Sequence, residues 1–194
     1  MIPIIHKVND IGTLNKLPND VGIEIDVRSN GNELILSHDI EEVNDKFEEF
    51  LNTYDKKLIV ANIKESGIED KVVDQLENKN IKDYFLLDVE FPYIFKCLKN
   101  RQKNIAIRFS ENEPIETAKL FKNNFKWLWI DTVSKLPLNK KNLKIVNKFK
   151  SCLVCPERWG RPNQIKSYKK RLKSLNFLPD AVMTSLKYAE KWLI

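Results

Sequence analysis

The segment Val21-Gly-Ile-Glu-Ile-Asp-Val27 decides the fold that this sequence predicts. Apolar and acidic side chains alternate along it, and residues two apart in a strand share one face. The apolar residues therefore predict a face packed against helices, whereas Glu24, Asp26 and the following Arg28 point together in the opposite direction. Acidic groups near the carboxyl end of an otherwise apolar strand are typical of a parallel strand that leads to a functional site.

Short apolar segments of the same kind recur along the whole chain. Amphipathic stretches of helical period separate most of them. One is Glu41–Tyr54, with Val43, Phe47, Phe50 and Leu51 on one stripe. Strands that alternate with helices predict βαβ units and a parallel sheet. The eight expected strands are Ile2–His6, Val21–Val27, Leu58–Lys64, Tyr84–Asp88, Ile105–Phe109, Trp127–Asp131, Cys152–Cys155 and Ala181–Thr184.

This number of strands predicts a compact (β/α)8 TIM barrel of the α/β class, in which a closed sheet leaves no edge strand. The length of 194 residues lies near the lower end for such barrels, about 200 residues, so some helices must be short. We therefore expect one domain that spans residues 1–194. A doubly wound open sheet with fewer strands is the structural alternative.

Polar side chains gather where the expected strands end. In a barrel the carboxyl ends of all strands meet at one rim, and the catalytic groups of barrel enzymes lie there. The sequence therefore predicts a single functional rim. Its candidate residues are His6, Glu24, Asp26, Lys64, Asp88, Arg108, Asp131 and Glu157.

Composition limits the classes of protein to which the chain can belong. Hydrophobic residues make up 42% and charged residues 31%, which is typical of globular proteins and not of disordered chains. No apolar run approaches the roughly 18 residues of a membrane-spanning helix, and no basic segment precedes residues 2–6 as in a secretory signal. We therefore expect no transmembrane segment and a cytoplasmic protein.

The formal net charge of +6 suits an anionic partner. The lysines are spaced as on solvated helix faces, and no motif for a basic face with exposed aromatic residues is evident. A nucleic acid is therefore not the expected partner, and the sequence predicts no particular oligomeric state. Three cysteines do not suggest a disulfide framework, and Cys152 and Cys155 would face opposite sides of a strand, as core residues do.

The pair Glu24 and Asp26 requires a positive neighbour, because two adjacent carboxylates repel each other. A hard divalent cation is one candidate, since such ions prefer oxygen ligands. A salt bridge to Arg28 or Lys64 is the alternative.

The chain has two histidines, His6 and His38. His6 ends the first expected strand, and His38 follows a second short strand in the loop after Asp26. Histidine titrates near neutral pH, so a pair can act as base and acid across one phosphate. In a closed barrel both would face the rim that carries the two carboxylates.

The order His6, then Glu24-Ile-Asp26, then Leu36-Ser-His38-Asp39 resembles the glycerophosphodiester phosphodiesterase family, whose barrel is similar to that of phosphatidylinositol-specific phospholipase C. The resemblance implies that His6 and His38 are the catalytic pair of a phosphoric diester hydrolase. It also implies one divalent cation, Mg2+ or Ca2+, held by Glu24 and Asp26. The implied substrate is a glycerophosphodiester or a related small or phospholipid-derived phosphodiester.

The chain departs from the family at two positions. The family begins with His-Arg-Gly where this chain has His6-Lys7-Val8, so the phosphate charge would come from Lys7, Arg28 or Lys64. Asn62 stands where the resemblance implies a third, acidic metal ligand, and its amide oxygen carries no charge. A non-catalytic barrel that binds a phosphate ligand is therefore the alternative function.

A polar loop after the seventh expected strand adds further candidates. The stretch Glu157-Arg-Trp-Gly-Arg161 contains a glycine and charged residues, as a substrate-binding loop does. Arg108 and Arg161 could bind a second phosphate or a carboxylate. We therefore expect Arg108, Glu157 and Arg161 to contact substrate.

Overall fold

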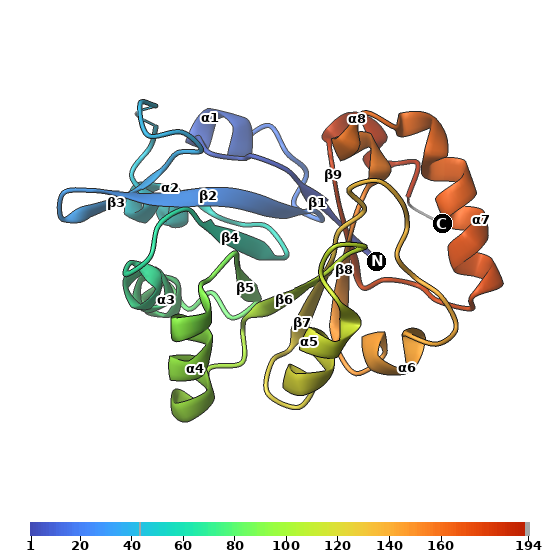
Figure 1. The fold of residues 1–194 in the computed structure, drawn as a ribbon. Coiled ribbons are helices and arrows are strands. Elements are labelled where there is room, and N and C mark those ends of the chain that lie inside the picture. Colours follow the sequence, from blue (N-terminus) through green and yellow to red (C-terminus); the bar gives the residue numbers. More distant parts are fainter. Residues whose placement is uncertain (43, 193–194) are drawn as a thin grey trace. The chain divides into compact units, whose positions relative to one another are not determined.

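The computed structural model describes residues 1–42 and 44–192 (Figure 1). Its contacts divide the chain into two compact units, which we describe separately. One comprises Ile5–Asn100, and the other comprises Met1–Ile4 with Arg101–Ile194. The expectation of one domain over residues 1–194 stays a prediction.

The order of strands in the sheet is β5-β4-β2-β1-β9-β8-β7-β6, with β3 paired to β2. These eight principal strands coincide with the eight expected segments, and helices alternate with them along the chain. The fold class is therefore α/β, a (β/α)8 TIM barrel, and the alternative with fewer strands is wrong.

The unit Ile5–Asn100 contains a parallel arrangement of β2, β4 and β5, with Asp26 of β2 in register with Asn62 of β4. Every residue of β4 and β5 is buried, as expected for strands of a parallel sheet that is covered on both faces. The strands are β2 (Gly22–Asn30), β3 (Glu33–Leu36), β4 (Ile59–Ile63) and β5 (Tyr84–Leu87). The helices are α1 (Ile11–Leu14), α2 (Phe47–Thr53), α3 (Glu69–Asn78) and α4 (Phe91–Asn100).

Strand β2 is longer than the sequence predicted because it forms an antiparallel hairpin with β3. Asn30 pairs with Glu33, so the loop holds only Gly31 and Asn32. Gly31 has a φ of 60°, the left-handed backbone that tight hairpin loops require. The hairpin directs the chain back along β2 toward Asp26.

Helix α2 begins later than the expected Glu41–Tyr54 stretch. Leu36 N–H donates to the carbonyl of Asp45 (3.0 Å), and Ile35 forms a bridge with Lys46, so Asp45 and Lys46 lie beside β3 and the helix begins only at Phe47. The predicted stripe residue Val43 lies outside the described residues. Phe47, Phe50 and Leu51 are buried as predicted.

The second unit contains β9, β8, β7 and β6, which pair in parallel. Trp127 to Ile130 are fully buried. The strands are β1 (Ile2–Ile5), β6 (Ala106–Phe109), β7 (Trp127–Ile130), β8 (Lys150–Val154) and β9 (Ala181–Thr184). The helices are α5 (Ile115–Phe121), α6 (Leu143–Val146), α7 (Ile165–Ser174) and α8 (Leu186–Ala189), and short 3-10 turns cover Pro156–Trp159 and Pro162–Gln164.

None of the helices described is both long enough and apolar enough to cross a membrane. The cytoplasmic location stays a prediction. The three cysteines are buried and none of them is in a disulfide in the described structure, which agrees with the predicted core role of Cys152 and Cys155.

Candidate active site

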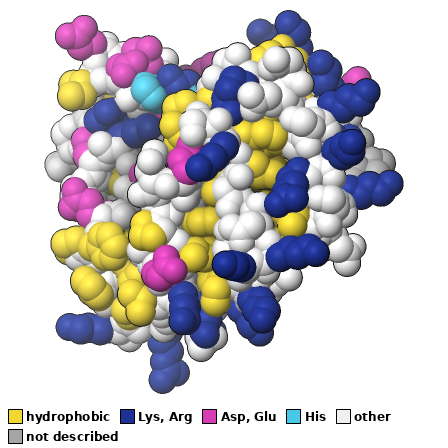
Figure 2. All heavy atoms as spheres, turned by 45° about the vertical axis from the view of Figure 1, so that its right-hand side comes forward, with side chains coloured by type: hydrophobic (Ala, Val, Ile, Leu, Met, Phe, Trp, Pro, Cys, Tyr) yellow, Lys and Arg dark blue, Asp and Glu magenta, His cyan; other side chains and the backbone are white. Residues whose placement is uncertain are grey.

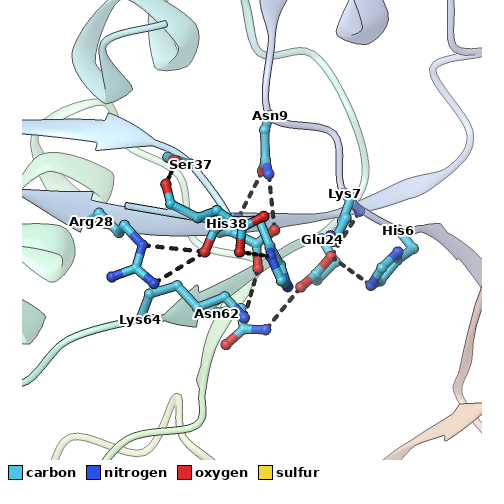
Figure 3. Close-up of polar contacts among 11 residues, drawn as sticks. His6, Lys7, Asn9, Glu24, Arg28, Ser37, His38, Asn62 and Lys64 are labelled. Carbon is cyan, nitrogen blue, oxygen red and sulfur yellow. Dashed lines mark hydrogen bonds and ion pairs between the residues drawn. The ribbon is translucent and has the colours of Figure 1, made fainter. Parts of the chain in front are cut away.

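The unit Ile5–Asn100 holds most of the candidate residues (Figure 3). They come from four places: directly after β1, within β2, at the carboxyl end of β4, and in the loop after β3. These residues are His6, Lys7, Glu24, Asp26, Arg28, His38, Asn62 and Lys64.

The carboxylates of Glu24 and Asp26 lie on the same face of β2, and each residue is 1% exposed. Glu24 Oε2 accepts the backbone N–H of Lys7 at 2.8 Å, and its Oε1 accepts the amide of Asn62 at 3.0 Å. Asp26 Oδ1 forms an ion pair with Lys64 Nζ at 2.9 Å. Lys64 thus forms a salt bridge that the sequence offered as an alternative, whereas Arg28 donates to a backbone carbonyl of the nearby loop. Binding of a metal ion by the carboxylate pair stays a prediction.

Asn9 is a site residue that the sequence analysis missed. Its Nδ2 donates to Asp26 Oδ2 at 2.9 Å, and its Oδ1 accepts the backbone N–H of Asp26 at 2.8 Å. These two hydrogen bonds hold Oδ2 and the backbone of Asp26, and the other carboxylate oxygen, Oδ1, faces Lys64. The sequence signal was weak: a single polar residue three positions after His6, in a segment expected to be a loop.

The carboxyl group of Glu24 has a raised pKa. Burial, and then the charge of Asp26, raise the pKa of Glu24 from 4.5 to about 7. The hydrogen bonds from Lys7 and Asn62 and the charge of Lys64 oppose this rise without cancelling it. Near neutral pH, the carboxyl group of Glu24 can therefore exchange a proton.

This shifted pKa predicts a pH-dependent stability in metal-free buffer. The folded state binds the Glu24 proton more tightly than the unfolded state, so stability should fall as pH rises from about 4.5 to about 7. Glu24→Gln retains a carbonyl acceptor but cannot ionise. We expect it to flatten this dependence and to be more stable than the unsubstituted protein at pH 7, measured by urea unfolding with chelator present. Glu48→Gln, at an exposed position of α2, is the control, and an equal slope for Glu24→Gln and the unsubstituted protein would contradict the assignment.

His6 stands directly after β1 and lies beside Glu24. Its Nε2 is 3.7 Å from Glu24 Oε2, and its side chain is 18% exposed. Lys7 follows with a left-handed backbone (φ 55°), and its N–H meets the same carboxylate. The imidazole is thus placed next to the buried carboxylates and retains access to solvent.

His38 reaches the site through the β2–β3 hairpin. Ser37 N–H donates to the carbonyl of Asp26 at 2.9 Å, which fixes the loop to β2. Arg28 donates from Nε and Nη2 to the carbonyl of His38 at 3.3 and 3.1 Å, so in this structure it supports the loop. His38 Nδ1 lies 3.0 Å from Asp39 Oδ1, and Figure 3 shows its ring directed toward the cluster that contains Glu24 and Asn62.

The donor set suits a hard divalent cation. Two carboxylates and one amide oxygen are ligands that Mg2+ and Ca2+ accept. The Oδ1 of Asn62 is buried without a hydrogen-bond partner, which is costly unless a cation or another donor occupies the site. Within the described residues no group of three or more His, Cys, Asp and Glu side chains could hold a metal, and the amide oxygen of Asn62 is the candidate third ligand.

An added charge at position 62 should strengthen metal binding. Asn62→Asp places a carboxylate in register with Asp26 on the adjacent strand, and a higher ligand charge raises affinity for hard cations. We expect a lower Kd for Mg2+ or Ca2+ by calorimetry. Asn62→Ala is the control and should weaken binding. Unchanged affinity in both variants would exclude Asn62 as a ligand.

The remaining substrate candidates lie in the second unit and already have protein partners. Arg108 donates to Glu113 at 2.7 Å and to Asp131 at 2.6 Å, and it is about one-third exposed. Trp159 Nε1 donates to the other oxygen of Asp131 at 2.9 Å. Arg108 is therefore held rigidly and its charge is balanced, while its contact with substrate stays a prediction.

Glu157 and Arg161 form hydrogen bonds with the segments that follow β9 and β7, respectively. Glu157 Oε1 accepts the hydroxyl of Thr184 at 3.0 Å and the N–H of Ser185 at 2.7 Å. Arg161 donates to the carbonyls of Thr132, Val133 and Ser134. These contacts give both residues a structural role after β7 and β9, and their role toward substrate stays a prediction.

Solved structures of other proteins share this fold over nearly the whole chain. A proposed glycerophosphoryl diester phosphodiesterase of Agrobacterium tumefaciens superposes with a TM-score of 0.70 at 10% identity, covering 98% of this chain and 96% of that chain. A glycerophosphodiester phosphodiesterase of the same organism gives 0.66 at 9% identity, covering 99% of both chains. A glycerophosphoryl diester phosphodiesterase of Parabacteroides distasonis gives 0.65 at 9% identity, covering 99% of this chain and 85% of that one. This chain has the glycerophosphodiester phosphodiesterase fold.

The similarity to the glycerophosphodiester phosphodiesterases lies in the fold and covers nearly the whole chain. The resemblance that the sequence predicted is therefore confirmed at the level of the fold. No family model matches the sequence, and no curated protein sequence matches it either.

Proposed function

We propose that this chain is a divergent member of the glycerophosphodiester phosphodiesterase family and hydrolyses a small phosphodiester. The observation that carries the proposal is the grouping of His6 and His38 with the buried pair Glu24 and Asp26 in one unit, in a chain with the fold of those enzymes. In the reaction an oxygen nucleophile adds to phosphorus and one P–O bond to an alcohol breaks. With water as the nucleophile the products are a phosphomonoester and an alcohol.

The two histidines would share the proton transfers. A carboxylate only accepts hydrogen bonds, so the contact between His38 Nδ1 and Asp39 leaves the proton on Nδ1 and frees Nε2 to take one from the nucleophile. His6, beside the Glu24 carboxylate, would donate a proton to the leaving alcohol oxygen. An opposite assignment of base and acid would give the same dependence on both residues.

Glu24, Asp26 and Asn62 would hold one Mg2+ or Ca2+ ion. When bound, such an ion neutralises the phosphate and stabilises the charge that develops in the transition state. Lys64, which is paired with Asp26 and about one-fifth exposed at its side chain, would contact a phosphate oxygen. Lys7 and Arg28 are the other proposed phosphate contacts.

A panel of phosphodiesters tests the activity. Bis-p-nitrophenyl phosphate, glycerophosphodiesters and glycerophosphoinositol should be incubated with the protein and with Mg2+, Ca2+ or Mn2+, and phosphorus NMR should identify the products. A phosphomonoester that forms without a cyclic phosphate at early times indicates direct attack by water. A cyclic phosphate indicates attack by a neighbouring substrate hydroxyl.

A non-catalytic phosphate-binding barrel is the second candidate. One observation favours it: Lys64 and the amide of Asn62 already compensate the two carboxylates from within the chain. Binding of phosphodiesters by calorimetry, without turnover of any panel member, would support this alternative and overturn the catalytic proposal.

A further inference from the structure

A cavity of about 660 Å3 lies in the second unit, outside the residues discussed above. Its volume is in the range of about 300–1,000 Å3 that is typical of small-molecule sites. Apolar side chains make up much of its lining, and no aspartate or glutamate is among the described residues that line it. The lining residues are Met1, Lys166, Lys169, Lys170, Leu172, Lys173, Asn176, Phe177, Leu178, Pro179 and Trp192.

The floor of this cavity is well packed. Trp192 is 1% exposed, and its Nε1 donates to Cys155 Sγ at 3.1 Å. Asn176 adopts a left-handed backbone (φ 49°) just after α7, and the N–H of Phe177 donates to the carbonyl of Leu172 at 3.1 Å. This helix ending turns residues 177–179 back against α7, so the hollow is part of the fold.

The rim of the cavity is cationic. Lys166, Lys169, Lys170 and Lys173 are spaced three and four residues apart, which places them on one face of α7. Helix α7 contains no acidic residue, and in the described part of the chain none of these four ammonium groups pairs with a carboxylate. Lys169 instead donates to the carbonyl of Lys191 at 2.7 Å. Like charges at this spacing repel each other, and an anion at the rim would remove that repulsion.

An exposed apolar side chain stands among these charges. Leu178 is 59% exposed, although a leucine side chain gains free energy when it leaves water. In Figure 2, which brings forward the side of the molecule that carries α7, apolar side chains are bordered by lysine and arginine. An apolar hollow with an unbalanced cationic rim is complementary to a molecule with a hydrocarbon chain and an anionic head group.

We propose that this cavity binds a single anionic amphiphile. The hydrocarbon chain would contact Leu172, Phe177 and Leu178, and the head group would lie among the ammonium groups of α7. The occupant is one molecule of lipid-like chemistry, and neither a membrane surface nor a second copy of the chain. The proposal stands independently of the phosphodiesterase activity, because none of these residues belongs to the candidate active site.

Calorimetry with dodecyl phosphate below its critical micelle concentration tests the proposal. We expect saturable binding of one molecule per chain, and Kd about tenfold higher for Lys166→Glu/Lys170→Glu, since each exposed charge contact contributes modestly. Leu178→Asp should weaken binding by a similar factor. Lys140→Glu/Lys141→Glu, which changes the same charge at exposed positions outside the cavity, should leave Kd unchanged.

Four outcomes would overturn the proposal. Equal affinity for dodecyl maltoside or dodecyltrimethylammonium would remove the role of the anion. Equal affinity for inorganic phosphate would remove the role of the hydrocarbon chain. Binding to anionic vesicles without binding of monomeric dodecyl phosphate would assign the surface to a membrane. Sedimentation that shows a dimer dissociated by Leu178→Asp would assign it to a second copy.

Discussion

Replacing His6 or His38 with alanine is expected to lower turnover of a cleaved phosphodiester by about 10²–10⁴-fold, because general acid–base catalysis contributes about that factor. The fold should remain intact, since the two side chains are 18% and 38% exposed and their truncation leaves little cavity. Rates of product formation measure the effect, and circular dichroism with thermal unfolding verifies the fold.

Three further results would define the roles of the histidines. The double variant should be little worse than the poorer single variant, because residues that act as one unit are strongly non-additive. The pH profile of kcat/KM should lose one limb in each single variant. Glu42→Ala, at an exposed position in the His38 loop, should retain full turnover and controls for loop disturbance. Equal activity of the histidine variants and the unsubstituted protein would refute the mechanism.

Removal of divalent metal is expected to abolish turnover, and Mg2+ or Ca2+ should restore it. The physical reason is the buried pair Glu24 and Asp26 on one face of β2, because carboxylate oxygens are ligands that a hard cation prefers. Activity after dialysis against EDTA, followed by titration with each metal, measures the dependence.

Asp26→Asn provides the matched test for this dependence. It retains the shape of the side chain and removes one ligand charge, so restoration of activity should require a higher metal concentration. Lys64 already forms an ion pair with Asp26 at 2.9 Å, so a lysine is the alternative source of positive charge at this site. Full activity in EDTA would mean that Lys64, without any metal, supplies the positive charge that phosphate transfer needs.

Much of the fold was predictable from local pattern. Strand positions followed from alternation and from short apolar runs, because successive side chains of a strand point to opposite faces of the sheet. The segment before Phe47 was not predictable in this way. Its apolar spacing favoured a helix. Asp45 and Lys46 instead pair with Leu36 and Ile35 of β3, and a helical pattern contains no information about such contacts between separate segments.

The identities of the site residues were predictable, whereas their partners were not. Glu24, Asp26, His6 and His38 stand out in the sequence because charged groups at strand ends are uncommon in a buried sheet. The sequence did not predict that the hairpin brings the carbonyl of His38 within 3.1 Å of Nη2 of Arg28, whose contact with phosphate stays a prediction. Contacts of this kind depend on strand register and turn geometry, which cannot be derived from composition or from the spacing of apolar residues.

The sequence by itself determined the eight principal strands, which alternate with helices, and it identified two acids in the second of them and two histidines as candidate site residues. Those features are local, since they depend on side-chain type and spacing. Only the tertiary structure decided that Asn9 holds Asp26, that Lys64 neutralises it, and that burial raises the pKa of Glu24 to about 7. These depend on which residues meet across strands and on how much water they exclude.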